Sequence, residues 1–162
     1  MKKHAILTLV VTALGVATLP VPAQVLTAEQ VPAAVKQAFQ KKFPAVKLVE
    51  WKIKTDENYE AEFTLKGTDI AAKFDPAGKW LETESAIAPS KIPQAVRATI
   101  AKQFKGYKVV ESQTLQRLNE ARPIYELHLE NAKEIVKAQF SDSGAILNQS
   151  AKPKAAETKS AK

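Results

Sequence analysis

The chain contains one pattern of residues twice. Residues 31–43 are matched 61 positions later by residues 92–104, and residues 74–81 are matched 66 positions later by residues 140–147. Because two separate matches occur in the same order, the sequence indicates an internal repeat, which constrains the fold more than any single motif does. We therefore expect two copies of one unit of roughly 60 residues.

A stripe of apolar residues at helical spacing opens each unit. Val35 and Phe39 belong to a series of apolar residues at steps of three and four, with polar residues between them. This pattern predicts an amphipathic helix that lies on an apolar layer. Thr27 with Gln30 matches a capping box that would start the helix, but Pro32 could equally occupy the first helical position. The sequence leaves both starts open.

After each helix the spacing of apolar residues changes to two, which is the pattern of half-buried antiparallel strands. A turn at residues 75–78, with Gly78 at a left-handed position, sets Trp80 opposite Phe74. The first unit is expected to have strands at residues 47–54, 59–65 and 70–74 and one from residue 79. The second is expected to have strands from residue 107, at 124–130 and 134–140, and through residue 146.

These elements predict an α+β fold of two tandem α-β-β-β-β units. In each unit one helix packs on one face of a four-stranded antiparallel sheet and leaves the other face open. The first unit is expected at residues 24–88 and the second at residues 89–150. Five extra residues of the second unit fall within residues 112–123, where the two units should differ most in shape.

The two ends of the chain differ from the repeat in composition. Residues 1–23 begin with lysines, continue with an apolar run and end with small residues at the expected cleavage site. This is the pattern of a secretory signal peptide cleaved after about Ala23. An apolar run of about 15 residues is shorter than the roughly 20 of a membrane span, so we expect only transient membrane contact. Residues 151–162 lack large apolar residues and are expected to form a disordered tail. We expect a periplasmic or secreted protein.

The net charge of the chain is +7, but its distribution matters more than its size. Residues 24–150 carry only +2, because the lysines of the two ends supply the remainder. A nucleic-acid surface needs basic residues clustered on the folded body. We therefore expect no nucleic-acid partner.

The chain resembles the PepSY-like family, also described as β-lactamase-inhibitor-like (BLIP-like), over residues 28–150. The resemblance rests on the Val-Pro or Ile-Pro start of each helix, on aromatic-acidic-apolar strands at residues 59–63 and 125–129, and on the Phe-Asp-x-x-Gly-x-Trp hairpin at residues 74–80. It implies a periplasmic or secreted bacterial protein with the fold of secreted β-lactamase inhibitor proteins. Those inhibitors carry disulfides, whereas this chain has no cysteine, so the resemblance does not imply inhibition of a β-lactamase.

The sequence contains few residues of the types that act in catalysis. The chain has no cysteine, and His128 is the only histidine after removal of the signal peptide. Nucleophilic mechanisms that use a thiol or a Ser-His pair therefore lack the residues they need. A zinc site needs three or four ligands, and the chain without its signal peptide offers one histidine. The five glycines do not have the spacing of a phosphate-binding loop. We expect no enzyme activity, no cofactor and no metal site.

The open face of the sheet is the candidate binding surface. Its acidic residues and lysines are expected to form a solvated charge ladder, with Leu81 on the same face. Such a surface suits a protein partner, for example a protease or an envelope enzyme. The alternative is a periplasmic small-molecule or cation binder with a site at the seam between the units. The oligomeric state is left open. The site residues expected on this face and its hairpin are Lys52, Lys54, Glu60, Glu62, Lys73, Trp80 and His128.

Overall fold

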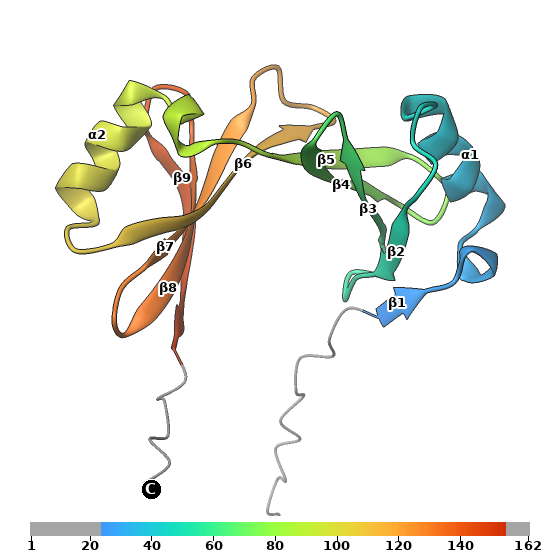
Figure 1. The fold of residues 1–162 in the computed structure, drawn as a ribbon, viewed down its shortest axis with the longest axis horizontal. Helices are drawn as coiled ribbons and strands as arrows, with labels where there is room; N and C mark the ends of the chain where they lie inside the picture. The colour runs from blue at the N-terminus through green and yellow to red at the C-terminus, as the bar shows by residue number, and fades with distance from the viewer. Residues whose placement is uncertain (1–23, 155–162) are drawn as a thin grey trace, which may run out of the picture.

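A computed structural model describes residues 24–154 of the chain. The predicted signal peptide and the last eight residues of the predicted tail lie outside the described residues. The fold is α+β, with two α-helices and a single antiparallel sheet of nine strands that follow one another in chain order (Figure 1). None of the helices in the described part of the chain is long and apolar enough to cross a membrane.

The helices and strands have the following bounds. The helices are α1 (Ala33–Lys42) and α2 (Gln94–Gln103), each preceded by a short 3-10 helix, η1 (Ala28–Gln30) and η2 (Pro89–Lys91). The strands are β1 (Gln24–Leu26), β2 (Glu50–Ile53), β3 (Tyr59–Leu65), β4 (Thr68–Phe74), β5 (Trp80–Ala86), β6 (Lys108–Arg117), β7 (Ile124–Glu130), β8 (Glu134–Phe140) and β9 (Ile146–Pro153).

The prediction of two four-stranded sheets is corrected by the pairing of β5 with β6. The two strands run antiparallel from the pair Glu82 and Arg117 to the pair Ala86 and Gln113, so the sheet continues from one half of the molecule into the other. An isolated sheet would leave the N–H and C=O groups of its edge strand open, and this pairing satisfies them. The strand β1, which pairs with β2, was not predicted because three residues are too few to show an alternation.

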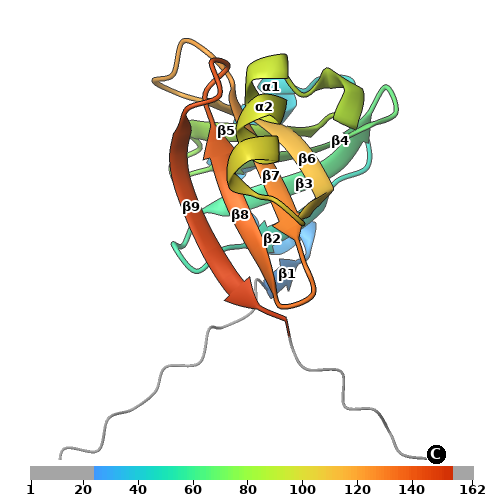
Figure 2. The same ribbon diagram turned by 90° about the vertical axis from the view of Figure 1, so that its left-hand side faces the viewer.

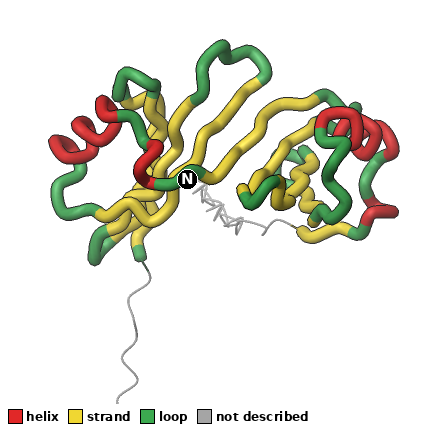
Figure 3. Tube along the Cα trace, turned by 45° about the horizontal axis from the view of Figure 1, so that its top comes forward, coloured by secondary structure: helices red, strands yellow, loops and turns green. Residues whose placement is uncertain are grey.

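Each helix packs on its own half of the sheet. Val35 and Phe39 of α1 are buried against β2 to β4, whereas Val96 of α2 is buried against β7 and β8. Figure 3 shows the two helices at opposite ends of the molecule, with strands between them. The capping-box pattern of Thr27 and Gln30 forms, but it starts the short helix η1. The prolines at positions 32 and 93 are the N-cap residues of the α-helices.

The two predicted hairpins have the same geometry. Trp80 lies opposite Phe74, as predicted, and Ile146 lies opposite Phe140. Each hairpin carries a register shift at the phenylalanine, and each turn contains a glycine with positive φ, Gly78 or Gly144. The last strand, β9, continues to Pro153, so the first three residues of the predicted tail are paired with β8 rather than disordered.

Candidate functional site

The sheet is bent into an arch, with the two helices on its outer side (Figures 1 and 2). We call the opposite side of the sheet the inner face. Strand register assigns the side chains of this face, because residues directly opposite each other on paired strands point to the same side. The residues on the inner face include, in strand order, Glu50, Lys52, Glu60, Glu62, Lys73, Glu82, Glu84, Glu111, Gln113, Leu115, Arg117, Ile124, Glu126, His128, Lys137 and Gln139.

Four of the predicted site residues form ion pairs on the first half of this face. Lys52 Nζ lies 2.6 Å from Oε2 of Glu62 and 3.1 Å from Oε1 of Glu50. The hydrogen bond to Glu62 is the main reason that the pKa of Lys52 lies above its ordinary value. Lys54 Nζ lies 2.9 Å from Oε1 of Glu60, which is only 5% exposed. The predicted solvated ladder is therefore wrong for Glu60, because the carboxylate is covered by its neighbours.

The third predicted lysine, Lys73, contributes to a row of charges that crosses the seam between β5 and β6. Its Nζ lies 3.9 Å from Oε1 of Glu82, whose Oε2 accepts a hydrogen bond of 2.5 Å from Nε of Arg117. The sequence placed Leu81 on this face. The register shift beside Lys73 instead brings Glu82 opposite that lysine, because a bulge changes which residues point to which side.

The second half of the inner face is organised around one buried carboxylate. Glu126 is 2% exposed and accepts hydrogen bonds from Gln113 Nε2 (2.9 Å) and Gln139 Nε2 (2.7 Å), and Lys137 Nζ lies 2.6 Å from its Oε1. Burial alone would raise the pKa of Glu126, but the donors, Lys137 foremost, outweigh it and hold the pKa below its ordinary value. Burial alone would lower the pKa of Lys137, but its bond to Glu126 and the negative charges of Glu126, Glu84 and Glu82 together outweigh it and raise the pKa. Glu126 is thus a fixed negative charge.

The pKa of the neighbouring carboxylate, Glu84, is shifted in the opposite direction to that of Glu126. Gln113 Nε2 also donates to Oε2 of Glu84 at 2.8 Å, so one amide links two carboxylates across the seam. Burial, followed by the negative charge of Glu126, raises the pKa of Glu84 above its ordinary value. Glu84 borders a groove of about 620 Å³ that crosses the seam on the inner face. The acidic residues along this groove are Glu50, Glu62, Asp69, Glu84 and Glu111.

The predicted site residue Trp80 does not join this inner face. It shares the helix side of the sheet with Phe74 and packs against the core under α1. Its Nε1 donates to Oγ1 of Thr83 at 2.9 Å, and Lys42 Nζ lies 3.7 Å from the centroid of its ring. These contacts hold Trp80 between the sheet and the end of α1.

His128, the one histidine within residues 24–154, lies on the inner face, where its alternation with Leu127 and Leu129 places it. His128 Nδ1 lies 2.6 Å from Oε2 of Glu111, and its Nε2 is enclosed without a hydrogen-bond partner among the described residues. It borders a hollow of about 180 Å³ together with Lys137 and Lys152. Within residues 24–154, no group of three or more His, Cys, Asp or Glu side chains could hold a metal ion.

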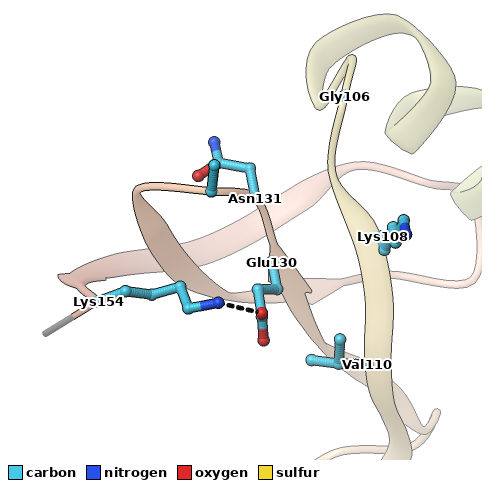
Figure 4. Close-up of a pocket in the computed structure, with 7 residues that line it drawn as sticks. Gly106, Lys108, Val110, Glu130, Asn131 and Lys154 are labelled. Atoms are coloured by element: carbon cyan, nitrogen blue, oxygen red, sulfur yellow. Dashed lines mark hydrogen bonds and ion pairs between the residues drawn. The ribbon is translucent and has the colours of Figure 1, made fainter. Parts of the chain in front are cut away.

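A further hollow, of about 280 Å³, lies between the start of β6 and the end of β7 (Figure 4). Lys108, Glu130 and Asn131 border it, and Lys154 Nζ closes one side by its ion pair of 2.5 Å with Glu130. This ion pair joins the end of β9 to β7. The hollow is small and lies away from the seam.

The residues that organise the seam were not among those predicted. Gln113 and Arg117 of β6 and Glu82 and Glu84 of β5 come together only because the two strands pair. Alternation within one strand shows which side chains share a face, but it does not show which strands are neighbours. The two glutamates within residues 82–84 were the only sign in the sequence of charged residues at the seam.

A family model described as "Putative beta-lactamase-inhibitor-like, PepSY-like" matches residues 21–71 and residues 57–148 of the chain. These two matches together span more than half of the chain. No curated protein matches the sequence.

The structure is similar to several crystal structures of Bacteroides proteins. A DUF2874 family protein from Bacteroides uniformis is 22% identical, with a TM-score of 0.68 over 74% of this chain and 88% of that one. A protein described as "putative periplasmic" from Bacteroides eggerthii is 22% identical, with a TM-score of 0.68 over 75% and 88%. A BLIP-like protein from Bacteroides fragilis is 23% identical, with a TM-score of 0.64 over 78% and 91%. At these identities the similarity establishes a shared fold.

Proposed function

Because this chain belongs to the PepSY-like, β-lactamase-inhibitor-like family, we propose that it is an exported, non-enzymatic protein of the bacterial envelope that binds another protein on its inner face. The observation that carries the proposal is the curved inner face, whose charged side chains are already held in place by ion pairs. Side chains that are ordered before binding lose less conformational entropy when a partner docks. Fixed charges of both signs also favour one partner orientation over others.

The proposed export rests on two observations. Residues 1–23 have the composition of a signal peptide, and a structural relative is described as periplasmic. The partner would then be a protein that is found outside the cytoplasm, such as a protease or an envelope enzyme.

We also propose that the two halves of the fold are tandem copies of one unit. The repeated helix and hairpin sequences support this, as do the matched positions of Gly78 under α1 and Gly144 under α2. In this assignment β2 to β5 correspond to β6 to β9. The arch would then result from joining two helix-backed half-sheets edge to edge through β5 and β6.

The test is to reverse one ion pair without breaking it. Lys52 and Glu62 lie 2.6 Å apart, and the double variant Lys52→Glu with Glu62→Lys keeps opposite charges at these two positions but exchanges them. The matched control exchanges Arg122 and Asp142, an exposed pair at 2.9 Å in the loops beside the hairpin. Affinity capture from a periplasmic extract should identify a partner that is lost in the first variant and retained in the control. A partner set that is the same for both variants would contradict binding on the inner face.

The seam groove supports a second candidate, a binder of small cationic molecules. Five carboxylates border the groove, and Lys52 pairs with two of them, Glu50 and Glu62. A cationic ligand that binds only the native state should raise the melting temperature. A polyamine and an arginine-containing peptide would serve as probes, with Glu111→Gln as the test variant and the exposed Glu120→Gln as the control. Equal shifts in both variants, or none in the wild type, would contradict this site.

A further inference from the structure

The sheet ends in a long strand whose outer edge faces solvent. Strand β9 is last in the strand order and runs for eight residues, of which all but the first are exposed. In Figure 2 it forms the margin of the sheet, with no other described element along its outer side. Leu147 on this strand is 54% exposed. Such an edge is a ready template for pairing with a further strand.

The hydrogen bonds to β8 show which backbone groups of β9 point outward. Lys154 N donates to the carbonyl of Lys133 at 2.8 Å, and opposite pairs along an antiparallel ladder alternate between bonded and non-bonded. By the observed register, Lys152 and Ser150 bond to β8, whereas Ala151 and Gln149 direct their N–H and C=O groups to the open edge. Pro153, which has no N–H, falls on an outward position, as proline at a sheet edge must.

The other half of the molecule has an equivalent edge, that of β5, and there the edge is covered by a strand. The β8–β9 hairpin has the geometry of the β4–β5 hairpin, with the same register shift and the same glycine turn. In the β4–β5 hairpin the outer edge of β5 is covered by an antiparallel strand, β6, which belongs to the other helix-backed half of the sheet. The equivalent edge of β9 is open within residues 24–154. A strand from another molecule of the same fold would cover the edge of β9 as β6 covers the edge of β5.

We propose that the edge of β9 is a dimer interface, at which β9 of a second copy of this chain pairs antiparallel and joins the two sheets. The free edge at the other end of the sheet is β1, which has three residues and cannot cover eight. Among the strands that the structure describes, another β9 is the free edge that has the required length.

The sequence of β9 is compatible with this symmetric pairing. A two-fold axis at Ser150, perpendicular to the sheet, places Gln149 opposite Ala151 of the second copy, so that the two outward-facing residues exchange backbone hydrogen bonds. The same register places Lys152 opposite Asn148 of the second copy. No like charges therefore face each other, and β9 contains no acidic residue that would be left without a cation.

The first test removes an outward N–H group. In Gln149→Pro the proline occupies an edge position that does not bond to β8, whereas Gln149→Ala keeps the N–H group and serves as the control. Sedimentation over a range of concentrations should show the wild type and Gln149→Ala approaching twice the monomer mass, with Gln149→Pro remaining monomeric. Circular dichroism of the proline variant should match the wild type. A wild type that stays monomeric at every concentration, or a folded proline variant that dimerises normally, would overturn the proposal.

The second test uses charge and keeps the backbone unchanged. Asn148→Glu would face Lys152 of the second copy and should tighten the dimer, whereas Asn148→Lys would place two lysines opposite each other and should weaken it. Because each contact occurs twice in a symmetric dimer, the dissociation constants of the two variants should differ by about tenfold or more. Equal constants would rule out this register. Asn148 stands opposite Gln139 and therefore points to the inner face, so the control for partner binding is Gln149→Pro instead. Gln149 stands opposite Ala138 and points to the helix side, so this variant should keep the partner capture described above.

Discussion

The backbone carbonyl of Ala95 lies directly over Gly144, and a Cβ atom at that glycine would approach the carbonyl oxygen to 2.5 Å. Ala34 has the same relationship with Gly78, at 2.6 Å. Each hairpin turn is thus pressed against the first turns of its helix. Real Cβ atoms do not approach a backbone oxygen this closely, so side chains larger than glycine force the helix and the turn apart.

The first prediction concerns these two contacts. Gly78→Ala and Gly144→Ala should each destabilise the protein by the cost of a left-handed alanine, roughly 1–2 kcal/mol, plus about 1–3 kcal/mol for the steric overlap. Gly67→Ala is the matched control, since its φ is also positive, at 78°, but nothing lies within 4 Å of the added Cβ. Urea denaturation would measure all three. If Gly67→Ala is as damaging as the other two, the helix contact does not contribute.

The second prediction concerns the buried carboxylate of Glu126. Glu126→Gln should cost about 1–3 kcal/mol at pH 7, because it removes charge-assisted hydrogen bonds from Lys137 and the two glutamines. The pKa of Glu126 is lowered in the folded state, so its contribution is complete above its unfolded pKa of about 4.3 and is lost as pH falls. Denaturation at several pH values should therefore show the wild type and the variant converging in acid. A constant difference would mean that the effect is not ionic.

The third prediction is the reverse case at Glu84. Because burial raises the pKa of Glu84 in the folded state, the ionised side chain opposes folding, and stability falls as pH rises through this raised pKa. Glu84→Gln should therefore be more stable than the wild type at pH 7, with the gain disappearing in acid. The amide of Gln113 can still donate to the new side-chain oxygen. Thermal melts of this variant and of Glu126→Gln should move in opposite directions at pH 7, and movement in the same direction would contradict the assignment.

Much of each half of the fold could be predicted from local patterns. The bounds of β3, β7 and β8 agree with the alternation of apolar and polar residues, because each of these strands has one face in a core. The joining of the halves could not be predicted in this way. It depends on the pairing of β5 with β6, which are separated in sequence by a whole helix.

In the candidate site, contacts between neighbouring strands of one half could be predicted from the sequence, whereas contacts across the seam could not. Lys52 and Glu62 were predicted together because they sit on neighbouring strands joined by a short turn. The link from Glu84 through Gln113 to Glu126 spans three strands and depends on the register at the seam. The sequence did not show the bulge beside Lys73, which shifts the register by one residue and brings Glu82 rather than Leu81 opposite that lysine.

The last prediction concerns Leu115, which with Ile124 forms an apolar pair on the mostly polar inner face. Leu115 is 1% exposed and stands opposite Glu84 on one side and the buried Ile124 on the other, apart from the two cores beneath the helices. We expect Leu115→Ala to cost about 2–5 kcal/mol, as truncation of a fully buried leucine does. The control is Leu118→Ala, just beyond the strand, where the side chain is 40% exposed and truncation should cost much less. Denaturation of the two variants would compare them. A small loss at Leu115 would show that the seam has no core of its own and is held by backbone pairing and polar contacts.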